Sequence, residues 1–237
     1  LSLIISQAEI NVLTNTFKVS KNQLLYLPFL FDDITTEAVA KLPTFEERKH
    51  FVMIGNYLHD PNVAAVKNVV ESIWPIIHEQ LPNAQLYIYG AYGMNRISSY
   101  LKPKHGIYVM GRASKSAEIL SSAKVLLSPI PYGAGLKTKF LEAMLCGTPS
   151  ITNTMGAEGI CEASRFSGFI EDDSIKQAEK AIALFSDRAT WLQAQHRGFN
   201  IIETRFSKLK RTQAGTFYRS NPSASYFTKQ QIPLKVD

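Results

Sequence analysis

The chain has 237 residues and a hydrophobic content of 45%, which is enough to build one or two packed domains. No stretch of the sequence is long and apolar enough to predict a membrane-spanning helix. The two cysteines, Cys146 and Cys161, are too few for a disulfide scaffold, and neither has a metal-ligand partner at a recognisable spacing. We therefore expect a protein of a reducing, cytoplasmic setting without a metal site.

The formal net charge of +6 is concentrated at the C-terminal end. From Thr204 onward the chain carries seven basic residues and one acidic residue, which gives +6 and leaves the rest near neutral. A basic tail can bind nucleic acid or an anionic membrane, or it can simply be solvated. The body contains no nucleic-acid-binding motif, so we expect no nucleic-acid partner. A peripheral contact with the inner face of a membrane and a solvated tail are the remaining alternatives.

Residues 1–30 predict a strand, a short helix and a second strand, at 1–6, 9–17 and 24–29. Residues 31–45 are polar and have few large apolar side chains, which is typical of a linker. One interpretation of the first thirty residues is a β-α-β unit that belongs to the domain following the linker.

Residues 46–205 alternate between short apolar runs and amphipathic stretches, a pattern typical of a mostly parallel sheet. The predicted strands are 51–55, 85–90, 106–111, 124–129, 149–152 and 167–170. The predicted helices are 63–80, 94–101, 114–122, 136–145, 175–185 and 187–205. This order predicts an α/β fold with a Rossmann-like, doubly wound sheet.

Local features define several of these helices. Asn62 and Ser114 are suited to cap the helices that follow them, and the run 172–174 is suited to cap the helix at 175–185. Pro75 lies inside the first long helix and predicts a kink or a break there. In the last helix an apolar stripe is expected to face the core, formed by Trp191, Leu192, His196, Phe199 and Ile202.

The stretch 128–160 indicates a ligand site. A strand ends at Pro129, Gly133 and Gly135 follow, and a helix is expected to begin at about Leu136. Glycines let the backbone approach a ligand closely. The first turn of a helix offers free N–H groups and a positive dipole end. This arrangement favours an anionic ligand.

Charged side chains lie at the start of the same helix. Lys137 and Lys139 add positive charge, and Glu142 could accept hydrogen bonds from the hydroxyls of a ribose. One alternative is a plain α/β crossover whose lysines are solvated, since glycine loops before helices are common. In that alternative Glu142 pairs with Lys139 on a solvated face.

The run GAGLKTKFLEAMLCGTP at 133–149, followed by GAEGI at 156–160, resembles the donor-binding segment of GT-B fold glycosyltransferases. It is most similar to the large retaining family numbered four. Proteins of this kind have two facing Rossmann-like domains, and the C-terminal one holds the sugar nucleotide. The resemblance implies that 46–205 form the donor-binding domain and that 206–237 form a crossover helix and a basic tail. It also implies that 1–30 end an N-terminal acceptor domain lying mostly upstream.

The resemblance also implies roles for single residues. Family members usually carry two glutamates eight positions apart; the second matches Glu142, and the first falls at Ala134, where the carboxylate is missing. Some relatives have a Gly-x-Gly-x-Lys loop instead, which this chain matches. The catalytic groups implied are therefore Lys137, on the pyrophosphate, and Glu142. The implied donor-binding residues are Gly55, Asn56, His59, Arg112, Gly133, Ala134, Gly135, Leu136 and Thr138.

Three of these positions differ from the family pattern or have a second interpretation. Relatives often carry arginine where this chain has Asn56, so a positive charge on the donor phosphates is lost. His59 faces the donor or is a solvated loop histidine. Arg112 stacks on the nucleotide base or pairs with an acid.

The expected activity is transfer of a sugar from a nucleoside diphosphate to an acceptor hydroxyl, with retention of configuration and without metal or cofactor. The acceptor, a glycan, a lipid-linked sugar or another molecule, would be held by the N-terminal domain. One alternative is a nucleotide-sugar binding module that has lost catalysis, suggested by Ala134 and Asn56. Another is a sugar-nucleotide epimerase of the same fold.

Overall fold

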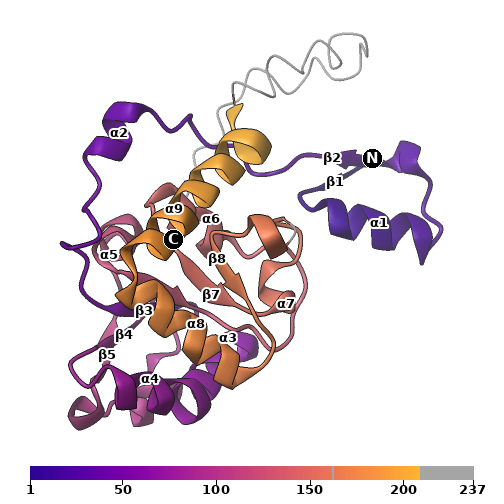
Figure 1. Cartoon of the computed structure of the whole chain (residues 1–237). Helices are drawn as coiled ribbons and strands as arrows, with labels where there is room; N and C mark the ends of the chain where they lie inside the picture. The colour runs from indigo at the N-terminus through magenta and orange to yellow at the C-terminus, as the bar shows by residue number, and fades with distance from the viewer. Residues whose placement is uncertain (162, 209–237) are drawn as a thin grey trace.

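The computed structural model describes residues 1–161 and 163–208, and its centre is a six-stranded parallel sheet (Figure 1). The strands are β3 (Phe51–Gly55), β4 (Leu86–Gly90), β5 (Ile107–Gly111), β6 (Val125–Leu127), β7 (Ser150–Thr152) and β8 (Gly168–Ile170). Their order across the sheet is β5-β4-β3-β6-β7-β8. Counted within this domain the order is 3-2-1-4-5-6, the doubly wound arrangement. The predicted fold class is therefore confirmed.

The central strands are short apolar runs because helices cover both faces of the sheet. Phe51 and Met53 of β3 point into one buried cluster, and Val52 between them points into the other. Helices α3 (Asp60–Asn68), α4 (Trp74–Gln80) and α8 (Ser174–Ser186) contribute to the first cluster. Helices α5 (Ser116–Ser122) and α6 (Thr138–Leu145) and the end of α9 (Arg188–Ile201) contribute to the second.

The first long helix is interrupted where Pro75 predicts a break. A π-helical turn, Val69–Ile73, separates α3 from α4, and Pro75 lies in the first turn of α4. A proline has no N–H to donate and displaces the carbonyl one turn earlier, which the wider turn accommodates. Trp74 anchors this point because its indole N–H donates to the carbonyl of His105 at 2.7 Å.

Two predicted helix caps are wrong. Helix α3 begins at Asp60 with His59 in the N-cap position, since Pro61 is suited to a first helical turn. Asn62 therefore lies inside the helix, where its side chain makes tertiary contacts. Helix α5 begins at Ser116, so Ser114 lies before it, and Lys115 occupies the cap position.

One predicted helix is not a helix of the expected kind. Residues 94–101 form two short 3₁₀ turns, Met94–Arg96 and Ser98–Tyr100. The hydroxyl of Ser98 donates to the carbonyl of Asn95 at 3.0 Å, and such local bonds compete with an α-helix. Conversely, the short helix α7 (Thr154–Ala157) lies between the predicted strands 149–152 and 167–170, where no helix was predicted.

The apolar stripe predicted for α9 is partly wrong. Leu192 and His196 are exposed, and the buried positions within the helix are Trp191, Ala194, Gly198 and Ile201. Ala194 and Gly198 carry little hydrophobic signal, but they let the helix approach the sheet closely. A Cβ at Gly198 would lie 2.6 Å from the hydroxyl of Ser167.

Residues before the sheet form a small unit of their own. Strands β1 (Ser2–Ile4) and β2 (Leu24–Tyr26) pair in parallel around α1 (Gln7–Asn15), in a sheet separate from the six-stranded one (Figure 1). The predicted strand, helix and strand are thus present. The linker contains the short helix α2 (Thr36–Ala40).

The C-terminal end of the described chain returns to the start of this linker. The N–H of Phe31 donates to the carbonyl of Phe206 at 2.7 Å, and the N–H of Lys208 donates to the carbonyl of Phe31 at 3.0 Å. The last described turn, the π-helical segment Ile202–Phe206, leads directly into this contact. Most of the predicted crossover helix and basic tail lies outside the described residues.

Arg48 is a fully buried cation at the junction of linker and domain. Its guanidinium donates to the carbonyls of Cys146 (2.8 Å) and Ala123 (3.1 Å) and to the hydroxyl of Thr148 (2.7 Å), and lies 5.0 Å from the ring centroid of Trp191. These carbonyls stand at the ends of α5 and α6, where helix dipoles are negative. Burial lowers the pKa of Arg48 to about 10, so it stays charged at neutral pH.

Candidate functional site

The candidate site lies at the carboxyl ends of β3 and β6, adjacent strands where the sheet order reverses. Ligands of open α/β sheets bind at this place. We call residues 55–62, which follow β3, and 128–142, which follow β6, the switch-point site. The two segments touch, because a Cβ at Gly133 would lie 3.6 Å from Cγ of Pro61.

The loop after β6 requires its glycines. Gly133 has φ +124° and Gly135 has φ +82°, backbone conformations that other residues rarely adopt. Ala134 between them is exposed, and Leu136 is buried in the core below. Helix α6 begins at Thr138, two residues later than predicted.

A single side chain fixes this loop to the neighbouring strand. The amide of Asn153 accepts a hydrogen bond from the N–H of Ile130 (3.1 Å) and donates to its carbonyl (2.8 Å). The same oxygen accepts from the N–H of Gly156 at 3.0 Å and so caps α7. Asn153 is not among the site residues predicted from the sequence, although an asparagine directly after a strand is a helix-start signal.

Lys137 lies in the N-cap position of α6, and its side chain is only 10% exposed. Its ammonium lies 3.5 Å from the carboxylate of Glu158 and donates a long bond, 3.4 Å, to the carbonyl of Gly133. Glu158 belongs to the GAEGI run after β7. Lys137 thus connects the two glycine-containing segments that the sequence singled out.

Lys139 connects the two halves of the switch-point site. Its ammonium donates to the amide oxygen of Asn62 at 2.8 Å and to the hydroxyl of Ser128 at 3.4 Å. The amide nitrogen of Asn62 in turn donates to the carbonyl of Asn56 at 2.8 Å. Burial of the ammonium lowers the pKa of Lys139 to about 8, and the negative charge of Glu142 opposes that shift.

Glu142 faces α5. Its carboxylate accepts a hydrogen bond from the hydroxyl of Ser116, the first residue of α5, at 2.9 Å. Among the ion pairs of the described residues there is none between Glu142 and Lys139, and Glu142 is half-buried. Glu142 therefore does not stand on a solvated face.

The remaining predicted residues lie either in the switch-point site or away from it. Gly55 and Asn56 lie in the switch-point site, with the side chain of Asn62 above Gly55. His59 is exposed at the start of α3. Arg112 is exposed after β5, which is two strands away from β3 at the edge of the sheet. The fold therefore brings together the residues after β3 and β6 but leaves Arg112 apart from them.

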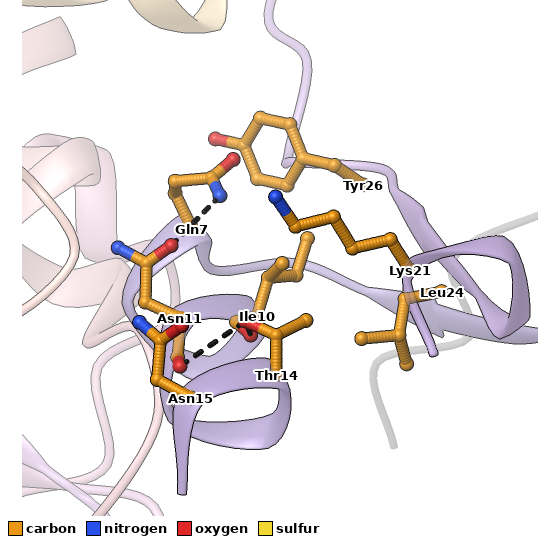
Figure 2. A pocket seen from close by; sticks show the side chains of 8 residues that line it. All are labelled: Gln7, Ile10, Asn11, Thr14, Asn15, Lys21, Leu24 and Tyr26. Carbon is orange, nitrogen blue, oxygen red and sulfur yellow. Dashed lines mark hydrogen bonds between the residues drawn. The ribbon is translucent and has the colours of Figure 1, made fainter. Parts of the chain in front are cut away.

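A separate pocket of about 330 Å³ lies on the β1–α1–β2 unit (Figure 2). Polar side chains of α1 form much of its wall, and the amide of Gln7 donates to the amide oxygen of Asn11 at 3.3 Å. Its lining residues are Gln7, Ile10, Asn11, Thr14, Asn15, Lys21, Leu24 and Tyr26. No residue of the switch-point site contributes to it.

Within 1–161 and 163–208 no group of three or more His, Cys, Asp and Glu side chains could hold a metal ion. In the same part of the chain, none of the helices has the length and apolar character needed to cross a bilayer.

Several solved structures share this fold. A mutant of TarM from S. aureus, in complex with fondaparinux, alpha-GlcNAc-glycerol and UDP, superposes with a TM-score of 0.73 at 14% identity, over 92% of this chain and 43% of TarM. WaaG, a glycosyltransferase involved in lipopolysaccharide biosynthesis, gives 0.68 at 14% identity, over 90% of this chain and 61% of WaaG. HepE from Anabaena, in complex with UDP and glucose, gives 0.65 at 14% identity, over 93% of this chain and 63% of HepE.

This chain therefore spans between 43% and 63% of the length of these three proteins. A comparison with curated protein sequences finds no significant match. A family model described as "Glycosyl transferases group 1" matches residues 48–187, more than half of the chain. That match begins at the buried Arg48 and includes both halves of the switch-point site. The chain belongs to the glycosyl transferases group 1 family.

Proposed function

We propose that residues 46–205 bind a nucleoside diphosphate sugar and that the protein transfers its sugar to an acceptor hydroxyl. The observation that carries the proposal is the switch-point site itself. Two glycines with positive φ precede a helix start, and two lysines lie in the first turn or just before it. Backbone N–H groups and cations of this kind stabilise the charge that develops on a diphosphate leaving group.

Specific roles follow from this proposal. Lys137 and the backbone from Gly133 to Thr138 contact the pyrophosphate, and Glu142 binds the ribose hydroxyls. Transfer retains the configuration of the sugar. It needs no metal, because lysines and a helix start supply the positive charge. The acceptor is held on the side of residues 1–30. A cytoplasmic location and a membrane contact through the basic tail stay predictions from the sequence.

A binding module without catalysis is the second candidate function. Ala134 is exposed in the loop between the two glycines, at the place where relatives carry a glutamate. That loss removes a carboxylate from the sugar side of the site and leaves the phosphate side unchanged. Hydrolysis or transfer of the donor sugar by the protein distinguishes an enzyme from a module of this kind.

The proposal is tested by calorimetric titration of the chain with UDP, ADP, GDP and CDP. We expect one of them to bind and Lys137→Ala to weaken that binding by about 1–3 kcal/mol, the scale of a lost hydrogen bond to a charged group. Lys176→Ala is a matched control, because Lys176 is exposed on α8. Binding that Lys137→Ala leaves unchanged in a folded protein contradicts the role of this loop.

A further inference from the structure

The start of helix α1 has the sequence pattern of a capping box, but its two polar side chains are not used for capping. Ser6 occupies the N-cap position and Glu9 follows three residues later, the spacing at which each side chain can accept a hydrogen bond from the other residue's backbone N–H. The side chain of Ser6 makes no capping bond. Among the side-chain hydrogen bonds and ion pairs of the described residues, none involves Glu9. The carboxylate of Glu9 is therefore available for a ligand.

Both side chains instead face glycines of the six-stranded domain. A Cβ at Gly159, in the GAEGI run, would lie 2.7 Å from Oγ of Ser6, and Ser6 is only 2% exposed. A Cβ at Gly135, in the loop after β6, would lie 3.8 Å from Oε1 of Glu9. Ile5, at the end of β1, packs against the second buried cluster of the domain. These contacts hold the carboxylate of Glu9 beside the glycine loop of the switch-point site.

The chemistry of a carboxylate at this place favours one kind of ligand group. A carboxylate repels a diphosphate, and the two lysines of the same loop and helix start oppose a second cation. Hydroxyl groups remain, and they form strong, charge-assisted hydrogen bonds to a carboxylate. In a nucleoside diphosphate sugar, the hydroxyls next to the diphosphate are those of the sugar. Residues 128–137 contain no acidic side chain, so the loop itself offers the sugar no carboxylate.

We propose that Glu9 binds hydroxyl groups of the donor sugar and thereby helps to determine which nucleotide sugar the site accepts. The inference rests on the function proposed above, because it presumes a nucleoside diphosphate sugar at the switch-point site. It adds to that site a side chain from the β1–α1–β2 unit, whereas the donor-binding residues predicted from the sequence all belong to 46–205. The small unit then has a part in recognising the donor.

Calorimetry with and without the sugar tests this role. UDP, ADP, GDP and CDP are titrated first, and the one that binds is then compared with its glucose, galactose and N-acetylglucosamine conjugates. Glu9→Gln keeps the size of the side chain and removes its charge. We expect this variant to weaken at least one conjugate by about tenfold and to change the free diphosphate by less than about twofold. Glu79→Gln, on the exposed face of α4, makes the same change in charge and should alter neither.

The outcomes separate this inference from the function on which it rests. If the free diphosphate binds but Glu9→Gln leaves every conjugate unchanged, or if no conjugate binds, the role of Glu9 is overturned and the diphosphate site stands. Equal losses for the conjugate and the free diphosphate mean that Glu9 only holds the unit in place, and tighter binding of both means that its charge opposes the diphosphate. Either result overturns the inference. If none of the four nucleoside diphosphates binds, the proposed function fails and this inference fails with it.

Discussion

Glu142 lies where two roles can be separated by experiment. Its carboxylate accepts a hydrogen bond from Ser116, so it positions α6 against α5. In our proposal it also binds the ribose. We expect Glu142→Gln to weaken binding of the nucleoside diphosphate that the chain binds by about tenfold, because a carboxylate accepts stronger hydrogen bonds than an amide. The same variant should change the affinity for the 2′,3′-dideoxy analogue of that nucleotide much less.

Ser116→Ala is the control for this prediction. It removes the hydroxyl that holds the carboxylate but keeps the carboxylate itself, so the preference for the ribose hydroxyls should persist. Calorimetric titration of both variants with both nucleotides gives the comparison. Equal losses for the two nucleotides in Glu142→Gln would remove Glu142 from the ribose site.

The stability of the fold depends on the single buried side chain of Arg48. The carbonyls of Cys146 and Ala123 and the hydroxyl of Thr148 share its guanidinium, and Arg48→Met leaves these buried oxygens without a donor. We expect a loss of about 3 kcal/mol or more in the free energy of unfolding. Arg48→Lys should recover little, since one ammonium cannot replace the planar fork.

Urea denaturation of the variants measures this loss. Lys49→Met is the matched control, because Lys49 is exposed beside Arg48, and we expect it to change the free energy of unfolding by no more than about 0.5 kcal/mol. A stable Arg48→Met protein would show that the helix ends do not depend on this cation.

Single residues also mark the limit of prediction from the sequence. Gly133 and Gly135 were recognisable because residues without a Cβ let the backbone approach a ligand closely, and both have a positive φ in the structure. Lys139 was recognised only as a charge near the helix start, because its partner Asn62 is 77 residues away. Asn62 itself was assigned to a cap. Contacts between segments that are far apart in the sequence decide such roles. The spacing of residues along the chain gives no information about these contacts.

At the scale of elements, α9 depends on small residues for its position. A Cβ at Gly198 would lie 2.6 Å from the hydroxyl of Ser167 and 3.2 Å from Cγ of Met144. Gly198→Leu should therefore force the helix away from β8 and lower the free energy of unfolding by about 1–3 kcal/mol, the usual cost of overpacking. Gln193→Leu places the same side chain on the exposed face of the helix and should have little effect. Thermal unfolding of the two variants tests the difference; equal melting temperatures would contradict it.

The strands were predicted almost completely, because buried parallel strands are short apolar runs bounded by glycine and proline. Strand β3 agrees with its predicted bounds, 51–55. Helices were predicted less accurately where small or polar residues stand at buried positions in place of apolar ones. For this reason the predicted stripe of α9 is partly wrong, and two 3₁₀ turns stand at 94–100 where the sequence predicts one helix. Caps failed where a side chain such as Asn62 is used in a tertiary contact.

At the scale of the whole molecule, the described residues form a six-stranded Rossmann-like sheet with its helices and a small β1–α1–β2 unit. A unit with two strands offers too little surface to form a facing acceptor domain. We expect the chain by itself to bind a nucleoside diphosphate but not to transfer sugar to an added acceptor. Turnover is measured as release of UDP from UDP-glucose and UDP-GlcNAc with and without acceptor sugars. Robust transfer by the chain alone would show that this assignment of domains is wrong.

The π-helical turn at Val69–Ile73 sets the angular phase between the two ends of one long helix. Such a turn holds one residue more than an α-helical turn, and each residue rotates an α-helix by about 100°. Removing one residue there would straighten the helix and rotate its beginning against its end. Either Trp74 would leave the core or Asn62 would turn away from Lys139. The inserted residue thus sets the rotation between the two ends of the helix. It allows Trp74 to be buried in the core while the amide of Asn62, on the same helix, accepts a hydrogen bond from Lys139.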